Sequence, residues 1–249
     1  MLGGGIIKHN ITELDKSSLL QDSINYKYRL FILDSNKNVL DLVEGTKNIG
    51  GYNNDSQSNV RRTTSFVLHL DESYRNESIE NKIYTWIGHD FRLQIGVYNL
   101  RKNDYTWYEC GYYSISAANT SYSAVTNDLS VSLSDWMVKL DGTKNGSIGG
   151  SPTIKIPVED ENGNKTIIKH ALIAFLQLSS IKDYIVDDIG EFYALPEHNK
   201  DWEEYRKSRP EWNVLPYDQE FDGSSTILDI VKAFCEIYPN YQYFFDAFG

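Results

Sequence analysis

The chain has 249 residues, of which 41% are hydrophobic and 24% charged, a composition typical of one or two globular domains. Its 35 acidic residues outnumber its 24 basic residues, so the formal charge is −11. This balance argues against stable nucleic-acid binding, which needs clustered Lys and Arg beside the phosphates. No apolar run approaches the roughly 20 residues that cross a bilayer. The N-terminus also has no signal-peptide core, so we expect neither a membrane anchor nor secretion.

The first 25 residues predict an N-terminal arm. They begin with a Gly tract and continue through residues 13–21, a stretch that can form one or two helical turns. Because this stretch is short and largely polar, we expect residues 1–25 to be mobile.

Residues 26–140 predict a series of short antiparallel strands. Tyr28, Leu30 and Ile32 alternate with Lys27, Arg29 and Phe31, which places the first set on a core face. The Gly-, Asn- and Ser-rich residues 44–59 indicate a loop. In the next strand the even positions from Val60 to Leu70 form an apolar face that includes Arg62.

The following segments continue the same pattern. Phe91, Leu93, Ile95 and Val97 alternate with polar residues, and the strand 105–115 is aromatic on both faces. Simple alternation places Tyr105, Trp107 and Tyr113 opposite Tyr108 and Tyr112. Leu129, Val131 and Leu133 predict a last strand that runs into residues 135–140. We therefore expect an all-β domain, an antiparallel barrel or tube, over residues 26–140.

A smaller α+β domain is expected over residues 141–249. Residues 141–152 indicate a Gly-rich linker or long loop, and Asn162-Gly163 favours a hairpin between 153–158 and 166–169. A buried helix is favoured over a strand at 170–180, and an amphipathic helix at 225–238 begins at Ser224 or Ser225. Tyr241–Asp246 reads as an aromatic strand. Its apolar edge predicts either a covering partner or a longer polypeptide.

The sequence contains no motif for catalysis, metal binding or cofactor binding, so no enzyme activity is expected. The five histidines lack zinc spacing, and the calcium-like turns that begin at Asp34 and Asp160 lack glycine at the sixth position. Cys110 and Cys235 are expected to be free thiols, with a disulfide between them left open. The carboxylate pairs Asp187-Asp188 and Glu203-Glu204 leave a glycosidase open as an alternative.

The order of several segments resembles the N-terminal region of phage tail hub proteins, from long-tailed phages and phage-like particles. The resemblance extends over roughly residues 27–249, and each motif is weak alone. The segments that carry it are Asn59–Leu68, Trp86–Gly88 leading into Phe91–Gly96, Tyr105–Ile115, Asp135–Gly142, Leu228–Ile237 and Tyr243–Gly249.

The resemblance implies a structural virion protein, a homotrimeric baseplate or tail-tip hub that closes the tail tube. Its implied partners are the tail tube or distal tail protein, the tape-measure protein, and distal fibre or receptor-binding proteins. The implied location is the virion tail, assembled in the host cytoplasm. DNA would pass only transiently through a lumen whose acidic wall repels phosphates. Family members run further, which implies a second domain truncated at its C-terminus.

Seven residues are candidates for subunit contacts or structural roles, since aromatic and arginine side chains supply most anchoring area at interfaces. Arg61 and Arg62 point to opposite faces of one strand, and only Arg62 should be desolvated, held by a carboxylate. The main alternative function is a carbohydrate-binding β-sandwich module of a phage tail fibre, and a glycosidase comes third. The candidates are Arg62, Trp86, Trp107, Trp136, Tyr243, Phe244 and Phe245.

Overall fold

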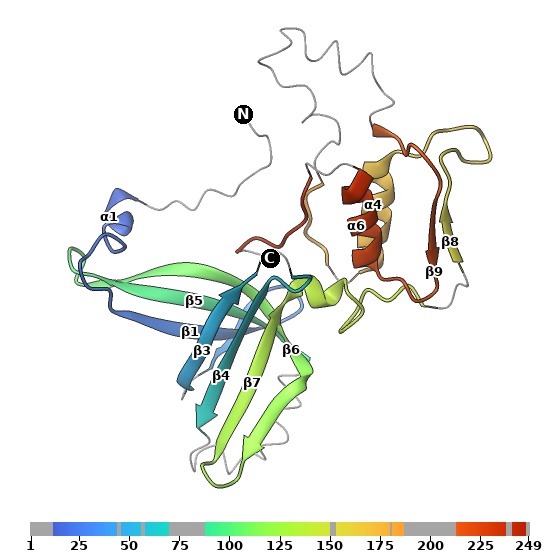
Figure 1. Cartoon of the computed structure of the whole chain (residues 1–249). Helices are drawn as coiled ribbons and strands as arrows, with labels where there is room; N and C mark the ends of the chain where they lie inside the picture. Colours follow the sequence, from blue (N-terminus) through green and yellow to red (C-terminus); the bar gives the residue numbers. More distant parts are fainter. Residues whose placement is uncertain are drawn as a thin grey trace. The chain divides into compact units, whose positions relative to one another are not determined.

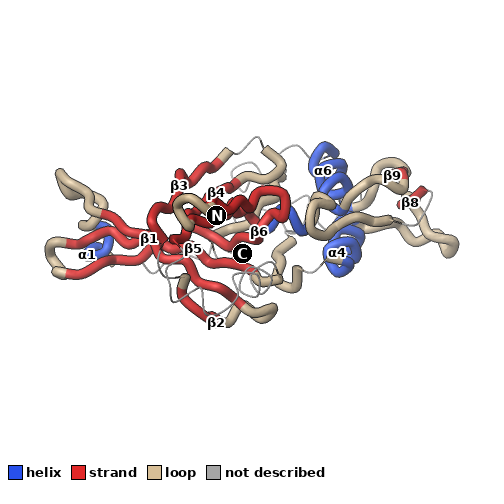
Figure 2. The backbone as a smooth tube through the Cα atoms, turned by 90° about the horizontal axis from the view of Figure 1, so that it is seen from below, coloured by secondary structure: helices blue, strands red, loops and turns tan. Residues whose placement is uncertain are grey.

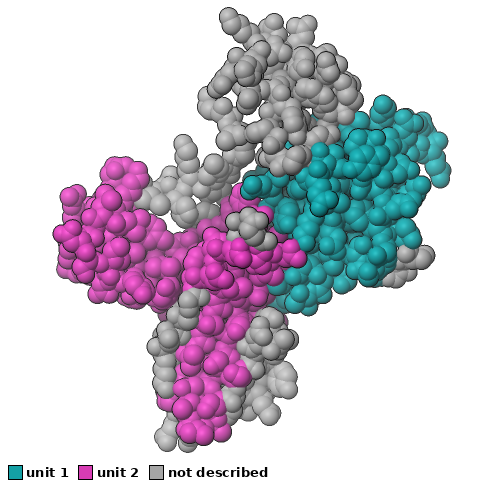
Figure 3. All heavy atoms as spheres, viewed as in Figure 1, with its two compact units in different colours: residues 1–5, 138–243 teal, residues 6–137, 244–249 magenta. Residues whose placement is uncertain are grey.

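The computed structural model of the chain describes residues 12–43, 46–55, 58–69, 88–149, 153–179, 181–186, 213–237 and 241–247. Two compact units can be separated (Figure 3). The β unit comprises Ile6–Met137 together with Phe244–Gly249, and the helical unit comprises Val138–Tyr243. The last described residues of the chain, 244–247, thus belong to the β unit.

One antiparallel sheet of seven strands forms the β unit (Figure 1), in the order β2-β1-β5-β6-β7-β4-β3. The strands are β1 (Tyr26–Leu33), β2 (Val39–Leu42), β3 (Thr46–Asn54), β4 (Arg62–His69), β5 (Asp90–Asn99), β6 (Asp104–Ser123) and β7 (Asp128–Asp135). Within the described residues, no pairing of β2 with β3 closes the sheet, so the predicted barrel is corrected to an open sheet. Short β2 and irregular β3, which carries two register shifts, are poor partners for a closing ladder.

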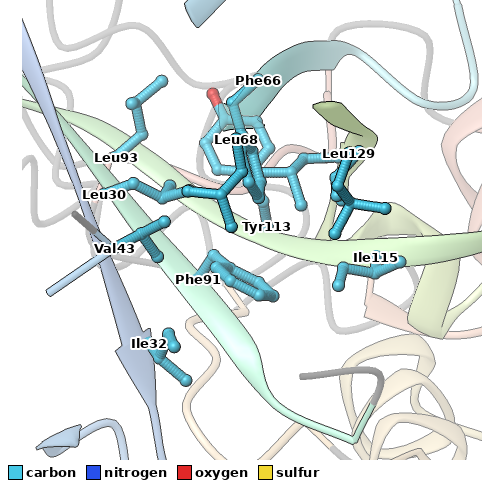
Figure 4. Close-up of a cluster of buried hydrophobic side chains, with 12 residues drawn as sticks. Leu30, Ile32, Val43, Phe66, Leu68, Phe91, Leu93, Tyr113, Ile115 and Leu129 are labelled. Atoms are coloured by element: carbon cyan, nitrogen blue, oxygen red, sulfur yellow. The ribbon is translucent and has the colours of Figure 1, made fainter. Parts of the chain in front are cut away.

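The sheet curls around a hydrophobic core in spite of its open edges. Phe66 of β4 and Phe91 of β5 are separated by two intervening strands, yet their ring centroids lie 6.4 Å apart. In a flat sheet the two strands would be about 14 Å apart. Figure 4 shows the side chains that converge on this core: Leu30, Ile32, Val43, Phe66, Leu68, Phe91, Leu93, Tyr113, Ile115 and Leu129.

The alternation in β4 and β7 confirms the periodicity argument. In β4 every second residue from Arg62 to Leu68 is buried, and in β7 the same holds from Leu129 to Asp135. The two strands pair in register, with Phe66 opposite Val131. Each strand therefore contributes one face to the core.

A β-bulge in β6 corrects the predicted arrangement of its aromatic residues. Leu93 pairs with Gly111 and Gln94 pairs with Glu109, so Cys110 is the extra residue. Gly111 has a φ of 120°, which side chains with a Cβ rarely adopt. The bulge shifts the alternation by one residue. As a result Tyr105, Trp107 and Tyr112 share one face, and Tyr108 and Tyr113 share the other.

The second half of the N-terminal arm is anchored, in contrast to the mobile segment expected. The helix α1 (Glu13–Lys16) carries a capping box between Thr12 and Asp15. Its backbone then meets the β5–β6 hairpin: Asn99 Nδ2 donates to the Leu14 carbonyl at 2.7 Å, and the Tyr108 hydroxyl donates to the Asp15 carbonyl at 2.9 Å. Residues 1–11 lie outside the described part of the chain.

Strand β3 occupies most of the region predicted as a loop. Its Gly- and Asn-rich sequence has low strand propensity, but neighbouring β4 is a regular strand with an open edge. β3 pairs with that edge through an irregular ladder in which Ile49 lies opposite Phe66. Tertiary pairing therefore overrides the local sequence signal.

In the helical unit, two helices lie side by side (Figure 2) and a two-stranded sheet accompanies them. The elements are α4 (Ile168–Leu178), α6 (Ile227–Ile237), β8 (Thr153–Ile156) and β9 (Gln219–Asp222), and the short 3-10 helix η1 (Trp136–Lys139) leads into this unit. The two predicted helices are confirmed. The predicted hairpin is confirmed only at its turn, where Glu159 and Lys165 form an isolated antiparallel bridge around Asn162-Gly163. The flanking strands are corrected, since β8 pairs with β9 and helix α4 begins within the expected second strand.

The segment after Leu140, predicted as a linker or long loop, is a loop that holds the start of α6. The amide groups of Ile227 and Leu228 donate to the carbonyls of Gly146 and Leu140, at 2.8 and 3.0 Å. The Thr226 hydroxyl accepts from the Asp229 amide at 3.2 Å, so Thr226 caps the helix in place of Ser224 or Ser225. These bonds satisfy amides that a helix start otherwise leaves unpaired. The Gly-rich segment is thus part of the fold.

Candidate interaction surfaces

Arg62 lies at a buried centre of the β unit and is only 7% exposed. Its backbone amide donates to Asp135 Oδ2 at 2.9 Å, and its Nε lies 3.7 Å from the same oxygen. Nη1 donates to the Cys110 carbonyl at 3.4 Å and Nη2 to the Asp246 carbonyl at 3.0 Å. The prediction that a carboxylate holds a desolvated Arg62 is confirmed.

The bulge in β6 makes room for this guanidinium. A Cβ added to Gly111 would lie 2.5 Å from Arg62 Nη1, so any larger residue would collide with it. The bulge also presents the Cys110 carbonyl, which accepts a second bond from the Tyr113 hydroxyl at 2.9 Å. Glycine at this position therefore serves both the local backbone and the arginine.

Burial controls the ionisation of the groups around Arg62. Desolvation raises the pKa of Asp135, partly offset by hydrogen bonds from the Met137 and Arg62 amides and by the Arg62 charge. Desolvation also raises the pKa of Cys110 to about 11, so its sulfur is a thiol and a poor nucleophile at neutral pH.

Phe245 and Asp246 lie beside Arg62. The Phe245 ring meets Trp136 edge to face, with 6.1 Å between the centroids, and Trp136 is buried with Leu33 and Tyr112. Residues 241–246 form no strand, which corrects the predicted aromatic strand. Packing on Trp136 covers Phe245, so this ring needs no strand pairing.

The remaining candidates are more scattered. Phe244 is 65% exposed, and Tyr243 is half-buried in the helical unit. Trp107 lies on the outer sheet face, and Trp86 falls outside the described residues. The structure therefore brings together Arg62, Trp136 and the segment with Phe245.

A second surface is formed by side chains on the outer face of β1, β5 and β6, where cations alternate with aromatic rings. Lys27 Nζ lies 3.7 Å from the Tyr105 ring centroid, and Arg29 Cζ lies 3.8 Å from the Trp107 ring centroid. Such contacts hold a cation over the negative face of a ring. We call this surface the cation–aromatic face; it consists of Lys27, Arg29, Phe31, Arg92, Gln94, Tyr105, Trp107 and Glu109.

A chain of polar contacts links the two arginines of this face. Arg29 Nε donates to Gln94 Oε1 at 2.5 Å, and Gln94 Nε2 donates to Glu109 Oε1. Glu109 Oε2 then lies 3.5 Å from Arg92 Nε. Arg29 is thus held by a hydrogen bond at Nε, whereas Arg92 is held by an ion pair with Glu109 and forms no hydrogen bond there. Among the described residues, no hydrogen bond is formed by their terminal amino groups.

Gly96 is part of this face because its missing side chain lets the Trp107 indole pack directly on the backbone. A Cβ added at Gly96 would come within 2.9 Å of the indole, so only glycine allows this close approach. The register explains the arrangement, since Gly96 lies between Lys27 on β1 and Trp107 on β6. Sequence reasoning singled out Trp107 and missed the cations, although Lys27 and Arg29 alternate with the core residues of β1.

Desolvation lowers the pKa of Arg29, and the nearby Arg92 charge lowers it further, while Glu109 acts in the opposite direction. Arginine still remains protonated at any physiological pH. Three cations and one carboxylate therefore give this face a positive charge on a strongly acidic chain. Chemically, the face offers fixed donors to carboxylates or other anions.

The two calcium-like turns are closed by their own hydrogen bonds. In each, one Asp oxygen accepts two backbone amides and the other accepts an Asn side chain, as Asp34 does with Asn36 and Asn38. Asp160 does the same with Asn162 and Asn164. No group of three or more His, Cys, Asp and Glu residues that could hold a metal ion occurs in the described part.

Among the residues that the structure describes, no helix is long and apolar enough to cross a membrane. Cys110 and Cys235 are free thiols. The carboxylate pairs Asp187-Asp188 and Glu203-Glu204 lie outside the described residues.

No protein-family model matches the chain, and no curated protein sequence matches it either.

Proposed function

We propose that the chain is a structural subunit of a phage tail hub, which closes the tail tube and connects it to distal host-facing proteins. The observation that carries this proposal is the order of the resembling segments, from Asn59–Leu68 to Tyr243–Gly249. In this role the chain forms a homotrimer in the virion tail, and its residues act through packing and contact.

The open sheet supports a role in assembly. Strand β2 is an outer strand of the sheet, and its Val39, Leu40 and Leu42 are all exposed. An apolar edge strand readily pairs with another chain. The negative charge of the chain also suits a channel wall that DNA must pass without adhering.

Co-expression with the proteins encoded beside it tests the proposal. Light scattering of the purified assembly should give a mass with three copies of this chain per ring. Leu40→Lys, on the β2 edge, is expected to prevent the assembly. Leu100→Lys should leave it intact, since Leu100 is 70% exposed and lies on the β5–β6 turn. A chain that stays monomeric beside all of these proteins would contradict the hub role.

A carbohydrate-binding module of a tail fibre is the second candidate, because Trp107 and Tyr105 lie on a sheet face beside the polar Gln94 and Glu109. The positions of the cations oppose it. Sugars stack on open aromatic faces, whereas Arg29 and Lys27 already lie over these two rings. A glycan array should therefore show no binding. Specific binding that is lost on Trp107→Ala would favour the fibre module over the hub.

A further inference from the structure

We propose that the cation–aromatic face is a docking site for a short acidic peptide segment of another polypeptide, bound in an extended conformation with carboxylates at alternate positions. This inference rests on the geometry of the β unit and is independent of the hub assignment.

The spacing of the cations matches such a peptide. Lys27 and Arg29 are two residues apart on β1, which corresponds to about 6.8 Å. Arg92 is the diagonal neighbour of Arg29, because Arg29 pairs with Gln94 in the adjacent strand; diagonal neighbours are about 7–8 Å apart. Alternate side chains of an extended peptide are also about 6.8 Å apart. Three alternate carboxylates can therefore each meet one cation.

The donors on the face are fixed before any peptide binds. Gln94 holds Arg29 through a hydrogen bond at Nε, and Glu109 holds Arg92 through an ion pair. Trp107 lies beneath the Arg29 guanidinium. The terminal amino groups, which can make paired bonds with carboxylates, take part in no hydrogen bond among the described residues. Preorganised side chains lose less conformational entropy on binding.

Charge selects a short peptide over a long polyanion. The face carries three cations and one carboxylate, but the whole chain has a charge of −11. A nucleic acid that extended beyond the face would meet the repulsion of the remaining surface. A peptide segment with three carboxylates is short enough to stay within the face and avoids this repulsion. A sugar lacks the charges and would have to displace Lys27 and Arg29 from the rings.

Fluorescence anisotropy with a labelled synthetic peptide tests the proposal directly. The peptide carries three aspartates at alternate positions among glycine and serine, and its isomer carries the same three aspartates consecutively. The alternate peptide should bind the full chain about tenfold more tightly than the isomer. Arg29→Gln and Arg92→Gln should each weaken its binding about tenfold, because each removes a charge-assisted pair.

Arg101→Gln is the matched control, since Arg101 is an exposed cation on the β5–β6 turn, outside the face. It should leave the affinity within twofold. Circular dichroism establishes that each variant is folded. Equal affinities for the two peptides, or an equal effect of Arg29→Gln, Arg92→Gln and Arg101→Gln, would mean that the peptide binds by nonspecific charge attraction. Either result would overturn the proposal. Stronger binding of a single-stranded oligonucleotide, or self-association of the chain that Arg29→Gln abolishes, would replace the acidic peptide with a different occupant.

Discussion

The buried centre at Arg62 and the cation–aromatic face use the same guanidinium group in opposite ways. Arg62 directs Nε toward a carboxylate and donates from both terminal nitrogens to carbonyls. Arg29 forms one hydrogen bond at Nε and Arg92 one ion pair, and each guanidinium lies over an aromatic ring. The first arrangement directs every nitrogen of the guanidinium to a group of the fold itself. In the second, the terminal amino groups form no hydrogen bond among the described residues.

The contrast teaches that burial of an arginine does not by itself indicate an interface. Period-2 alternation points Arg62 into the core, where the fold itself satisfies it. The same alternation places Lys27 and Arg29 on the outer face. There they contact aromatic rings, which do not take up their hydrogen-bond donors. Hydrogen bonding of the terminal amino groups within the fold separates Arg62 from the arginines that can bind a partner.

Arg62→Ala should give the largest effect, because it leaves the Asp135 carboxylate buried without its cation. We expect a loss of about 3–5 kcal/mol in the free energy of unfolding. The half-buried neighbour is the matched control, and Arg61→Ala should cost about 0–1 kcal/mol. Urea unfolding at neutral pH measures both. A second substitution, Asp135→Asn, should restore part of the loss, and equal small losses for the two single variants would refute the account.

The pH dependence of Arg62→Ala follows from Asp135. Because burial raises its pKa in the folded state, the folded protein takes up this proton at a higher pH than the unfolded chain. Protonation therefore favours folding as the pH falls through the folded-state pKa. Without Arg62 the pKa should rise further. The stability gap between the variant and the wild type should narrow as the pH is lowered from 7 to 4, and a gap that widens would contradict this.

Gly111→Ala should give the next largest effect, because it strains the bulge and pushes against Arg62. Its φ of 120° is unfavourable for alanine, and the added Cβ would lie 2.5 Å from Nη1. We expect a loss of about 2–3 kcal/mol. Gly163→Ala separates the two causes. Gly163 also has a positive φ, of 78°, but open space around it, so it should lose only about 1 kcal/mol. Similar losses of unfolding free energy for the two variants would show that the collision with Arg62 does not contribute to the effect of Gly111→Ala.

The smallest expected effect is local and concerns a charge pair outside both regions. Hydrogen bonds from Lys102 and Thr12 lower the pKa of Asp15 to about 2, from an ordinary 3.8. The ionised Asp15 carboxylate therefore stabilises the folded N-terminal segment fully above pH 3.8, and this stabilisation is lost as the pH falls toward 2. Hydrogen exchange of residues 12–21 should increase over this range. Asp15→Asn should show the faster exchange already at pH 6, whereas Glu13→Gln should not; unchanged exchange in Asp15→Asn would disprove the anchor.

Periodic segments could be read from the sequence because one face of each is buried. The core face of β4, the strand β7 and the helix α6 follow directly from their apolar spacing. The same reasoning predicted that Arg62 is buried, although not that the Cys110 and Asp246 carbonyls complete its bonding. Those partners are backbone atoms, and side-chain patterns carry no information about them.

The remaining features depend on contacts that are distant in the sequence. The bulge at Gly111 moves Tyr112 to the outer face, and no local signal in an aromatic strand reveals a one-residue insertion. Strand β3 forms because β4 offers an edge, and residues 141–149 are ordered because Leu140 and Gly146 accept the first amides of α6. The cation–aromatic face requires the pairing of three strands, which alternation in one strand cannot supply.

The central claim is that Arg62 stabilises the fold whereas the arginines of the cation–aromatic face bind a partner. Its most direct test is the thermal midpoint of unfolding, measured with and without the peptide that carries aspartates at alternate positions. The peptide should raise the midpoint of the wild type, because it binds only the folded state. Arg29→Gln should keep the wild-type midpoint without peptide and lose the rise, whereas Arg62→Ala should fall by roughly 10 °C or more without peptide. If Arg29→Gln lowered the midpoint as far as Arg62→Ala, the outer arginines would be structural, and the account would be wrong.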